Sequence, residues 1–158
     1  DLKIEAGIYY LDIKEEINVK GELTQRLKNQ SSKRQVPLHS LILELGFVNW
    51  IEKHQHPMLL AIESIGADKK WSSAFSRVFG RYKRAIGIDD AGVVFHSFRH
   101  CFLNQFKQTN ADQSLVRQLV GHTEQSLSLG RYAEKYPINR ALTTINTIKY
   151  GIELEISK

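Results

Sequence analysis

The stretch HSFRHCFLNQFKQTNADQSLVRQLVGH, residues 96–122, decides the fold that we expect for this chain. Its apolar residues recur three or four positions apart, which is the spacing of amphipathic helices. We expect one helix from His96 or Ser97 to about Thr109, and a second that is capped by Asn110 or Asp112 and ends at Gly121. The buried faces are expected to carry Cys101, Phe102 and Phe106 in the first helix and Leu115, Val116, Leu119 and Val120 in the second.

Both helices place basic side chains at their ends. His96 and Arg99 lie three positions apart at a helix start, so they share one face near the positive end of the helix dipole, where a phosphate is favoured. Gly121 can adopt the left-handed conformation that ends a helix and turns the next side chain, His122, outward. Each feature is weak by itself, because a histidine at a helix end more often only caps carbonyl groups.

The flanking sequence predicts a small β-structure followed by helices. The stretch GIYYLDIK at 7–14 is rich in β-forming residues, 23–28 is expected to be the returning strand, and 34–37 follows a second turn. Further helices are expected at 38–45, 47–54, 70–86 and 138–149, and a terminal strand at 152–156. The fold class is therefore mainly α with a small N-terminal antiparallel hairpin or meander, an α+β domain.

Positive charge is concentrated in two segments. The 158 residues include 22 Lys and Arg against 17 Asp and Glu, a net charge of +5, and neither 24–40 nor 69–84 contains an acid. The helix at 70–86 has an apolar stripe for the core and a basic face that is free to lie along phosphates, although a merely solvated face is an equal alternative. The residues expected to contact phosphates are Lys33, Arg34, Lys69, Lys70, Arg77, Arg81, Lys83 and Arg84.

Several protein classes are excluded. The single cysteine, Cys101, cannot form an internal disulfide or a structural zinc site. No apolar run approaches the ~18 residues that cross a bilayer, and the first residues lack the pattern of a signal peptide. We expect one soluble, intracellular domain over residues 1–158.

The order of the motifs resembles the tyrosine recombinase family, also called lambda-type or phage integrases. That family carries an H-x-x-R box, a G-H at the end of the following helix, and then a nucleophilic tyrosine; the matching residues are His96, Arg99, His122 and Tyr132. The segment LKNQSSKRQVPLH at 27–39 is similar to the family's β-hairpin, in which a catalytic lysine precedes R-x-V-P-L, and this places Lys28 in that role. The resemblance covers nearly the whole chain.

The resemblance implies site-specific DNA recombination through a 3′-phosphotyrosine intermediate. Tyr132 would be the nucleophile, His96 would take its proton, Arg99 and His122 would hold the phosphate oxygens, and Lys28 would protonate the leaving oxygen. Because side chains supply the positive charge, no cofactor or metal is expected. The implied partner is double-stranded DNA at attachment sites, bound as a homotetramer by a protein that is a monomer in free solution, in the cytoplasm of a bacterial or phage-infected cell.

The chain departs from the family pattern in one respect. The family has a further catalytic arginine in a G-L-R-x-x-E helix upstream of the hairpin, whereas residues 1–27 contain no such motif and Arg26 lies in the hairpin. We therefore expect a catalytic domain that is truncated at its N-terminus, without the DNA-clamping domain, and nearly inactive.

Several alternatives stay open. Lys33 competes with Lys28 for the role of acid, and Tyr136 competes with Tyr132 as nucleophile. His96 and His100 have the spacing of metal ligands, but the glutamate of H-E-x-x-H is missing, so His100 is expected to support or pack. The alternative functions are a DNA-binding relative without catalysis and a type IB topoisomerase that relaxes supercoils with similar chemistry.

Overall fold

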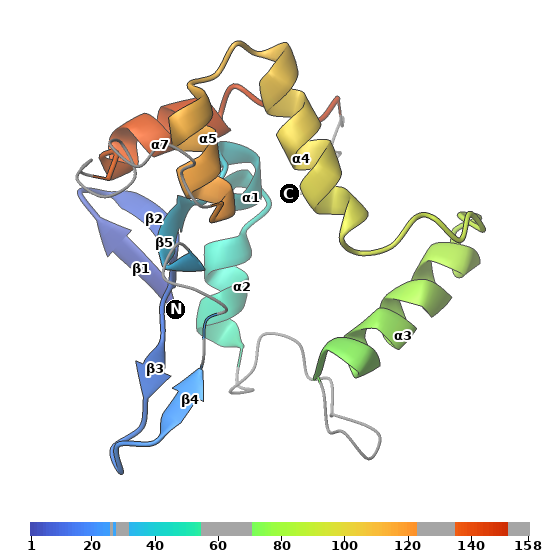
Figure 1. Ribbon diagram of the computed structural model, residues 1–158, viewed down its shortest axis with the longest axis horizontal. Helices are drawn as coiled ribbons and strands as arrows, with labels where there is room; N and C mark the ends of the chain where they lie inside the picture. The colour runs from blue at the N-terminus through green and yellow to red at the C-terminus, as the bar shows by residue number, and fades with distance from the viewer. Residues whose placement is uncertain (26, 28–31, 55–70, 123–134, 152–158) are drawn as a thin grey trace. The chain divides into compact units, whose positions relative to one another are not determined.

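Strands precede helices in the described part of the chain, as the sequence predicts for residues 7–149, and the terminal strand expected at 152–156 lies outside the described residues. The computed structural model describes residues 1–25, 27, 32–54, 71–122 and 135–151 (Figure 1). The strands are β1 (Leu2–Glu5), β2 (Ile8–Ile13), β3 (Glu16–Ile17), β4 (Leu23–Gln25) and β5 (Arg34–Pro37). The helices are α1 (Ser40–Glu44), α2 (Phe47–Lys53), α3 (Trp71–Ala85), α4 (Ser97–Gln108), α5 (Gln113–Val120) and α7 (Ile138–Ile145). This mixture of helices and antiparallel strands is compatible with the expected α+β class.

The chain divides into two compact units. One unit combines Asp1–Phe47 with Phe106–Lys158, and the other is Val48–Gln105. The first unit thus contains the strands together with α5 and α7, whereas the second contains α3 and most of α4. No described helix is long and apolar enough to cross a membrane.

The strands form two separate antiparallel sheets. In the three-stranded sheet β2 lies between β1 and β5, with Leu11 opposite both Leu2 and Val36. Ala6 and Gly7 join β1 to β2 and have positive φ values of 48° and 79°, which a tight two-residue hairpin turn requires. The sequence did not predict β1. It predicted a returning strand over 23–28, whereas the described strand there, β4, covers only Leu23–Gln25 and pairs with β3 in a separate two-stranded sheet. Residues 28–31 lie outside the described residues.

Helices α5 and α7 pack on the three-stranded sheet. Helix α7 contacts β5 and β2, and α5 contacts β5; Figure 1 shows both helices beside these strands. The four predicted apolar residues of α5 are buried, which confirms its core face. In α4, Phe106 is buried as expected, but Cys101 is exposed, because five positions along a helix of 3.6 residues per turn turn it away from Phe106.

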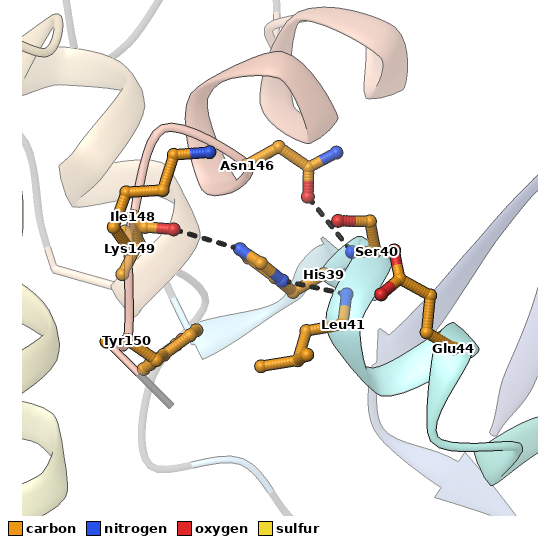
Figure 2. A pocket seen from close by; sticks show the side chains of 9 residues that line it. His39, Ser40, Leu41, Glu44, Asn146, Ile148, Lys149 and Tyr150 are labelled. Atoms are coloured by element: carbon orange, nitrogen blue, oxygen red, sulfur yellow. Dashed lines mark hydrogen bonds between the residues drawn. The ribbon is translucent and has the colours of Figure 1, made fainter. Parts of the chain in front are cut away.

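His39 ties the end of β5 to the end of α7 (Figure 2). Its Nδ1 accepts a hydrogen bond of 3.0 Å from the Leu41 amide and caps α1, so its Nε2 carries the proton and donates to the Ile148 carbonyl at 3.1 Å. The Asn146 side chain accepts from the Ser40 amide at 3.0 Å. These two contacts explain why α1 begins later than expected and α7 ends at Ile145 rather than near Lys149. His39, Ser40, Asn146 and Ile148 are among the residues that line an open pocket of about 420 Å³.

The ends of α5 agree with the sequence prediction. Asp112 is the N-cap, with its side chain accepting from the amides of Ser114 and Leu115 at 3.0 and 3.4 Å. Gly121 ends the helix in the left-handed conformation, with φ of 70°. A Cβ at Gly121 would lie only 2.8 Å from Nη1 of Arg34, so the guanidinium at the start of β5 lies directly against this glycine.

We predict that Gly121→Ala destabilises the protein more than Gly87→Ala. Both glycines have positive φ, 70° and 84°, so either alanine carries the cost of the left-handed region, about 1–2 kcal/mol. A Cβ at Gly87 would meet nothing within 4 Å, whereas a Cβ at Gly121 would meet Arg34. Urea unfolding of the two variants measures the difference; equal losses would mean that Arg34 moves aside without cost.

We predict that Asp112→Ala destabilises the protein by about 1 kcal/mol, because α5 loses its N-cap. Burial raises the pKa of Asp112, but hydrogen bonds from Tyr136, Leu115 and Ser114 and the charge of Arg140 outweigh it, so the pKa lies below its ordinary 3.8. The carboxylate therefore stabilises the fold fully above pH 3.8, and this contribution is lost as the pH falls through the folded-state pKa.

Thermal unfolding at neutral pH and at low pH measures this loss. The control is Asp89→Ala, which removes an exposed acid in the turn after α3 and should change stability by less than about 0.5 kcal/mol. A difference between wild type and Asp112→Ala that persists unchanged at low pH would contradict the assignment.

Candidate functional site

His96 and Arg99 stand at the first turn of α4. The amide of Arg99 donates to the His96 carbonyl at 3.0 Å, so the two residues of the H-x-x-R box lie one turn apart, as predicted. Ser97 and Val94 form a reciprocal pair: the Ser97 amide donates to the Val94 carbonyl at 2.9 Å, and the Val94 amide donates to Ser97 Oγ at 3.0 Å. His96 is exposed and Arg99 is half-buried. Because the amides of Ser97, Phe98 and Arg99 already donate to backbone carbonyls, an anion at this helix start would be bound by the imidazole and the guanidinium.

His100 packs edge-on against His96, with ring centroids 5.1 Å apart. This contact fits the expectation that His100 supports His96. Among the residues that the structure describes, no group of three His, Cys, Asp or Glu side chains is arranged to hold a metal ion. A site without metal stays a prediction.

Arg34 lies against Gly121, the residue that directly precedes His122 at the end of α5. The amide of His122 donates to the Arg117 carbonyl at 2.9 Å, which completes the helix cap, and the His122 side chain is exposed. Arg34 lies against Gly121 and donates from Nη1 to the Ser32 carbonyl at 2.7 Å. The sequence assigned Arg34 only to phosphate contact, and nothing in its spacing placed it against the glycine that precedes the predicted catalytic His122.

Other predicted site residues fall elsewhere. Tyr132, Lys28, Lys69 and Lys70 lie outside the described residues. His96 and Arg99 belong to the unit Val48–Gln105, whereas Arg34 and His122 belong to the other unit. The structure therefore describes two groups of predicted site residues, each within its own unit.

The chain that follows Tyr132 is attached to α5 and to the start of β5. The Gln118 side chain accepts from the Tyr136 amide at 3.0 Å and donates to the Tyr136 carbonyl at 3.4 Å. Lys135 Nζ donates to the Lys33 carbonyl at 3.3 Å. Sequence reasoning did not single out Gln118, because no short-range pattern marks a glutamine that binds a segment 18 residues away.

Tyr136, the alternative nucleophile, is engaged in a structural network. Its hydroxyl hydrogen-bonds Asp112, which raises the pKa of Tyr136, and desolvation raises it further. The guanidinium of Arg140 lies over its ring at 4.6 Å and also binds Asp112 at 3.0 Å. The Tyr136 hydroxyl is thus engaged in contacts within the first unit, and the choice of Tyr132 as nucleophile stays a prediction.

The two faces of α3 carry different chemistry. Arg77, Arg81 and Arg84 are exposed, and their spacing of four and three places them on one helix face. Lys83, which the sequence grouped with them, is only 8% exposed and donates to the backbone carbonyls of Asp90 and Val93. The predicted basic face is thus available at the three arginines, while the Lys83 ammonium is turned toward the protein.

A search of the curated proteins finds no match to this chain, and a search of the solved structures finds none. A scan against protein-family models gives a match over residues 5–137, a span that contains the H-x-x-R box, Gly121–His122, Tyr132 and Lys28. Because this match covers most of the 158 residues, the chain belongs to the phage integrase family.

Proposed function

We propose that this chain exchanges DNA strands at specific sites through a covalent 3′-phosphotyrosine intermediate. The Tyr132 oxygen attacks the phosphorus of one phosphodiester, forming the phosphotyrosine ester and releasing the 5′-oxygen, which gains a proton. The 5′-hydroxyl of a second strand then attacks this ester, rejoins the backbone and returns the proton to tyrosine. The bond energy is retained at each step, so no hydrolysis and no ATP are needed.

The observation that carries this proposal is the family match over residues 5–137. Membership of the phage integrase family supports site-specific DNA recombination in general and DNA as the substrate. The finer assignment to named residues is our proposal. It is supported by the H-x-x-R box at the first turn of α4 and by the position of Arg34 against Gly121, the residue before His122.

Each proposed residue answers one chemical demand of the reaction. A phenol has a pKa near ~10, so Tyr132 needs a proton acceptor, and we assign this role to His96. Negative charge grows on the non-bridging oxygens in the transition state; Arg99 supplies a two-pronged donor and His122 another hydrogen bond. Lys28 protonates the leaving 5′-oxygen. Because these side chains provide the positive charge, the proposed reaction uses no cofactor.

The contacts on either side of residues 123–134 support delivery of Tyr132 toward His122. His122 directly precedes this segment at the end of α5, and Lys135 and Tyr136 directly follow it on α5 and β5.

The proposal extends to assembly and location. Recombination joins two duplexes at four cleavage sites, so we propose a homotetramer on attachment-site DNA and a monomer in free solution. We place the reaction in the cytoplasm of a bacterial or phage-infected cell, and we propose that residues 1–158 act as one catalytic domain.

We predict that Tyr132→Phe abolishes the covalent protein–DNA adduct, whereas Tyr136→Phe retains it. The product of the complete gene and the 158-residue chain are each incubated with nicked suicide duplexes, in which the released strand diffuses away and traps the ester. Denaturing electrophoresis measures the adduct. Tyr136→Phe is the matched control, because it removes an identical hydroxyl that binds Asp112.

Each other outcome points to a different function. An adduct that persists in Tyr132→Phe and vanishes in Tyr136→Phe would reverse the assignment of the nucleophile. DNA binding without any adduct would favour a DNA-binding relative without catalysis. Relaxation of plasmids that carry no specific site would favour a topoisomerase.

We predict that Arg81→Ala weakens DNA binding and reduces its salt dependence. Each phosphate contact that is lost lowers the slope of log K against log salt by about 0.9, and Arg77→Ala and Arg84→Ala should behave alike. Binding is measured by fluorescence anisotropy between ~50 and ~200 mM salt. Arg140→Ala removes an equal charge from a residue bound to Asp112 and should leave the slope unchanged; a slope unchanged in all variants would remove α3 from the interface.

A further inference from the structure

Lys83 occupies a position that phosphate binding does not explain. It is 8% exposed, and its ammonium donates to the carbonyls of Asp90 at 2.5 Å and Val93 at 2.8 Å. The neighbouring Arg81 and Arg84 are exposed. Because a buried ammonium is costly unless its donors are satisfied, these two bonds bind residues 90–93 firmly to the last turn of α3. Figure 1 shows this loop running from the end of α3 to the start of α4.

Lys83 shares a helix face with two aromatic residues that hold the same loop. Phe75, Phe79 and Lys83 are spaced four positions apart and so lie along one side of α3. Phe95 packs edge-on against Phe75 and Phe79, with ring centroids at 4.6 and 5.5 Å. One face of α3 therefore fixes the loop at both ends, through carbonyls near residue 90 and through the ring of Phe95.

Hydrogen bonds and the peptide link between Val93 and Val94 connect Lys83 to the H-x-x-R box. The Asp90 carbonyl also accepts from the Val93 amide at 3.1 Å, which closes the turn. The next residue, Val94, is paired with Ser97 through both its amide and its carbonyl. The position and direction in which α4 begins, and hence the placement of His96 and Arg99, depend on where the Val93 carbonyl is held.

We propose that Lys83 is a positioning residue that orients the His96 and Arg99 side chains by holding the loop before α4, and that it makes no contact with DNA phosphate. The inference rests on the proposed function for its effect on catalysis. The structural part, that the ammonium holds the loop, can be tested without any reaction.

The first test is amide hydrogen exchange on the 158-residue chain. In Lys83→Met we expect at least about tenfold faster exchange at the amides of Val93, Val94 and Ser97, because their turn loses its anchor. The Ile86 amide, which directly follows α3 and donates to the Tyr82 carbonyl in its last turn, should keep its rate. Lys53→Met is the matched control, since it removes an equal charge from an exposed site in the same unit.

The second test separates positioning from phosphate contact, using the product of the complete gene. Lys83→Met should slow adduct formation at saturating DNA by at least about tenfold while leaving the salt slope of binding unchanged. Arg84→Met should instead lower that slope by about 0.9. A lower slope in Lys83→Met would overturn the proposal in favour of a phosphate contact. An unchanged rate of adduct formation would also overturn it, because Lys83 would then have no effect on His96 and Arg99.

Lys83→Arg keeps a cation with several donors and should restore both the exchange pattern and the rate to within about threefold of wild type. If Lys83→Met does not fold, Lys83→Gln replaces it, because it keeps a neutral donor on a shorter stem. Equal acceleration of exchange throughout the unit, or none at Val93 and Val94, would overturn the inference. If the wild type forms no adduct, the proposed function fails, and the exchange result still decides whether Lys83 holds the loop.

Discussion

The guanidinium of Arg34 lies against the α-carbon of Gly121, and this contact joins the first residue of β5 to the end of α5. It requires a residue without a side chain that also tolerates a positive φ, and glycine meets both conditions. The helix ends at this glycine, and His122 is the next residue. The end of the helix that precedes a predicted catalytic residue is thus packed against a segment that is far away in the chain.

Helix α5 also contacts the chain that follows Tyr132, again through residues that are far apart in the sequence. Gln118 binds both backbone groups of Tyr136, and Asp112, the cap at the other end of the helix, binds the Tyr136 hydroxyl. One short helix therefore presents His122 at its end and also receives the chain that follows Tyr132. This arrangement gives Tyr136 a structural role.

Helix α3 shows how one basic sequence can serve two purposes. Its arginines face solvent, where they can meet phosphates, while Lys83 points the other way and binds backbone carbonyls next to a cluster of phenylalanines. Composition alone treats these four cations as equivalent. They differ in the side of the helix on which they lie. The burial of Lys83 depends on the loop at residues 90–93, whose carbonyls accept from its ammonium.

The sequence by itself determined the elements whose signals are local: the helices at α3, α4 and α5, the Asp112 cap, the Gly121 stop, the buried face of α5 and the family. Each structural element depends on residues within a few positions of one another, whereas the family follows from the order of motifs along most of the chain. Only the tertiary structure decided the pairing of β2 with β1 and β5, the burial of Lys83, the roles of His39 and Gln118, and the placement of Arg34 against Gly121. These depend on contacts between distant segments, which no local pattern specifies, because the partner of a strand or a buried side chain is chosen by packing.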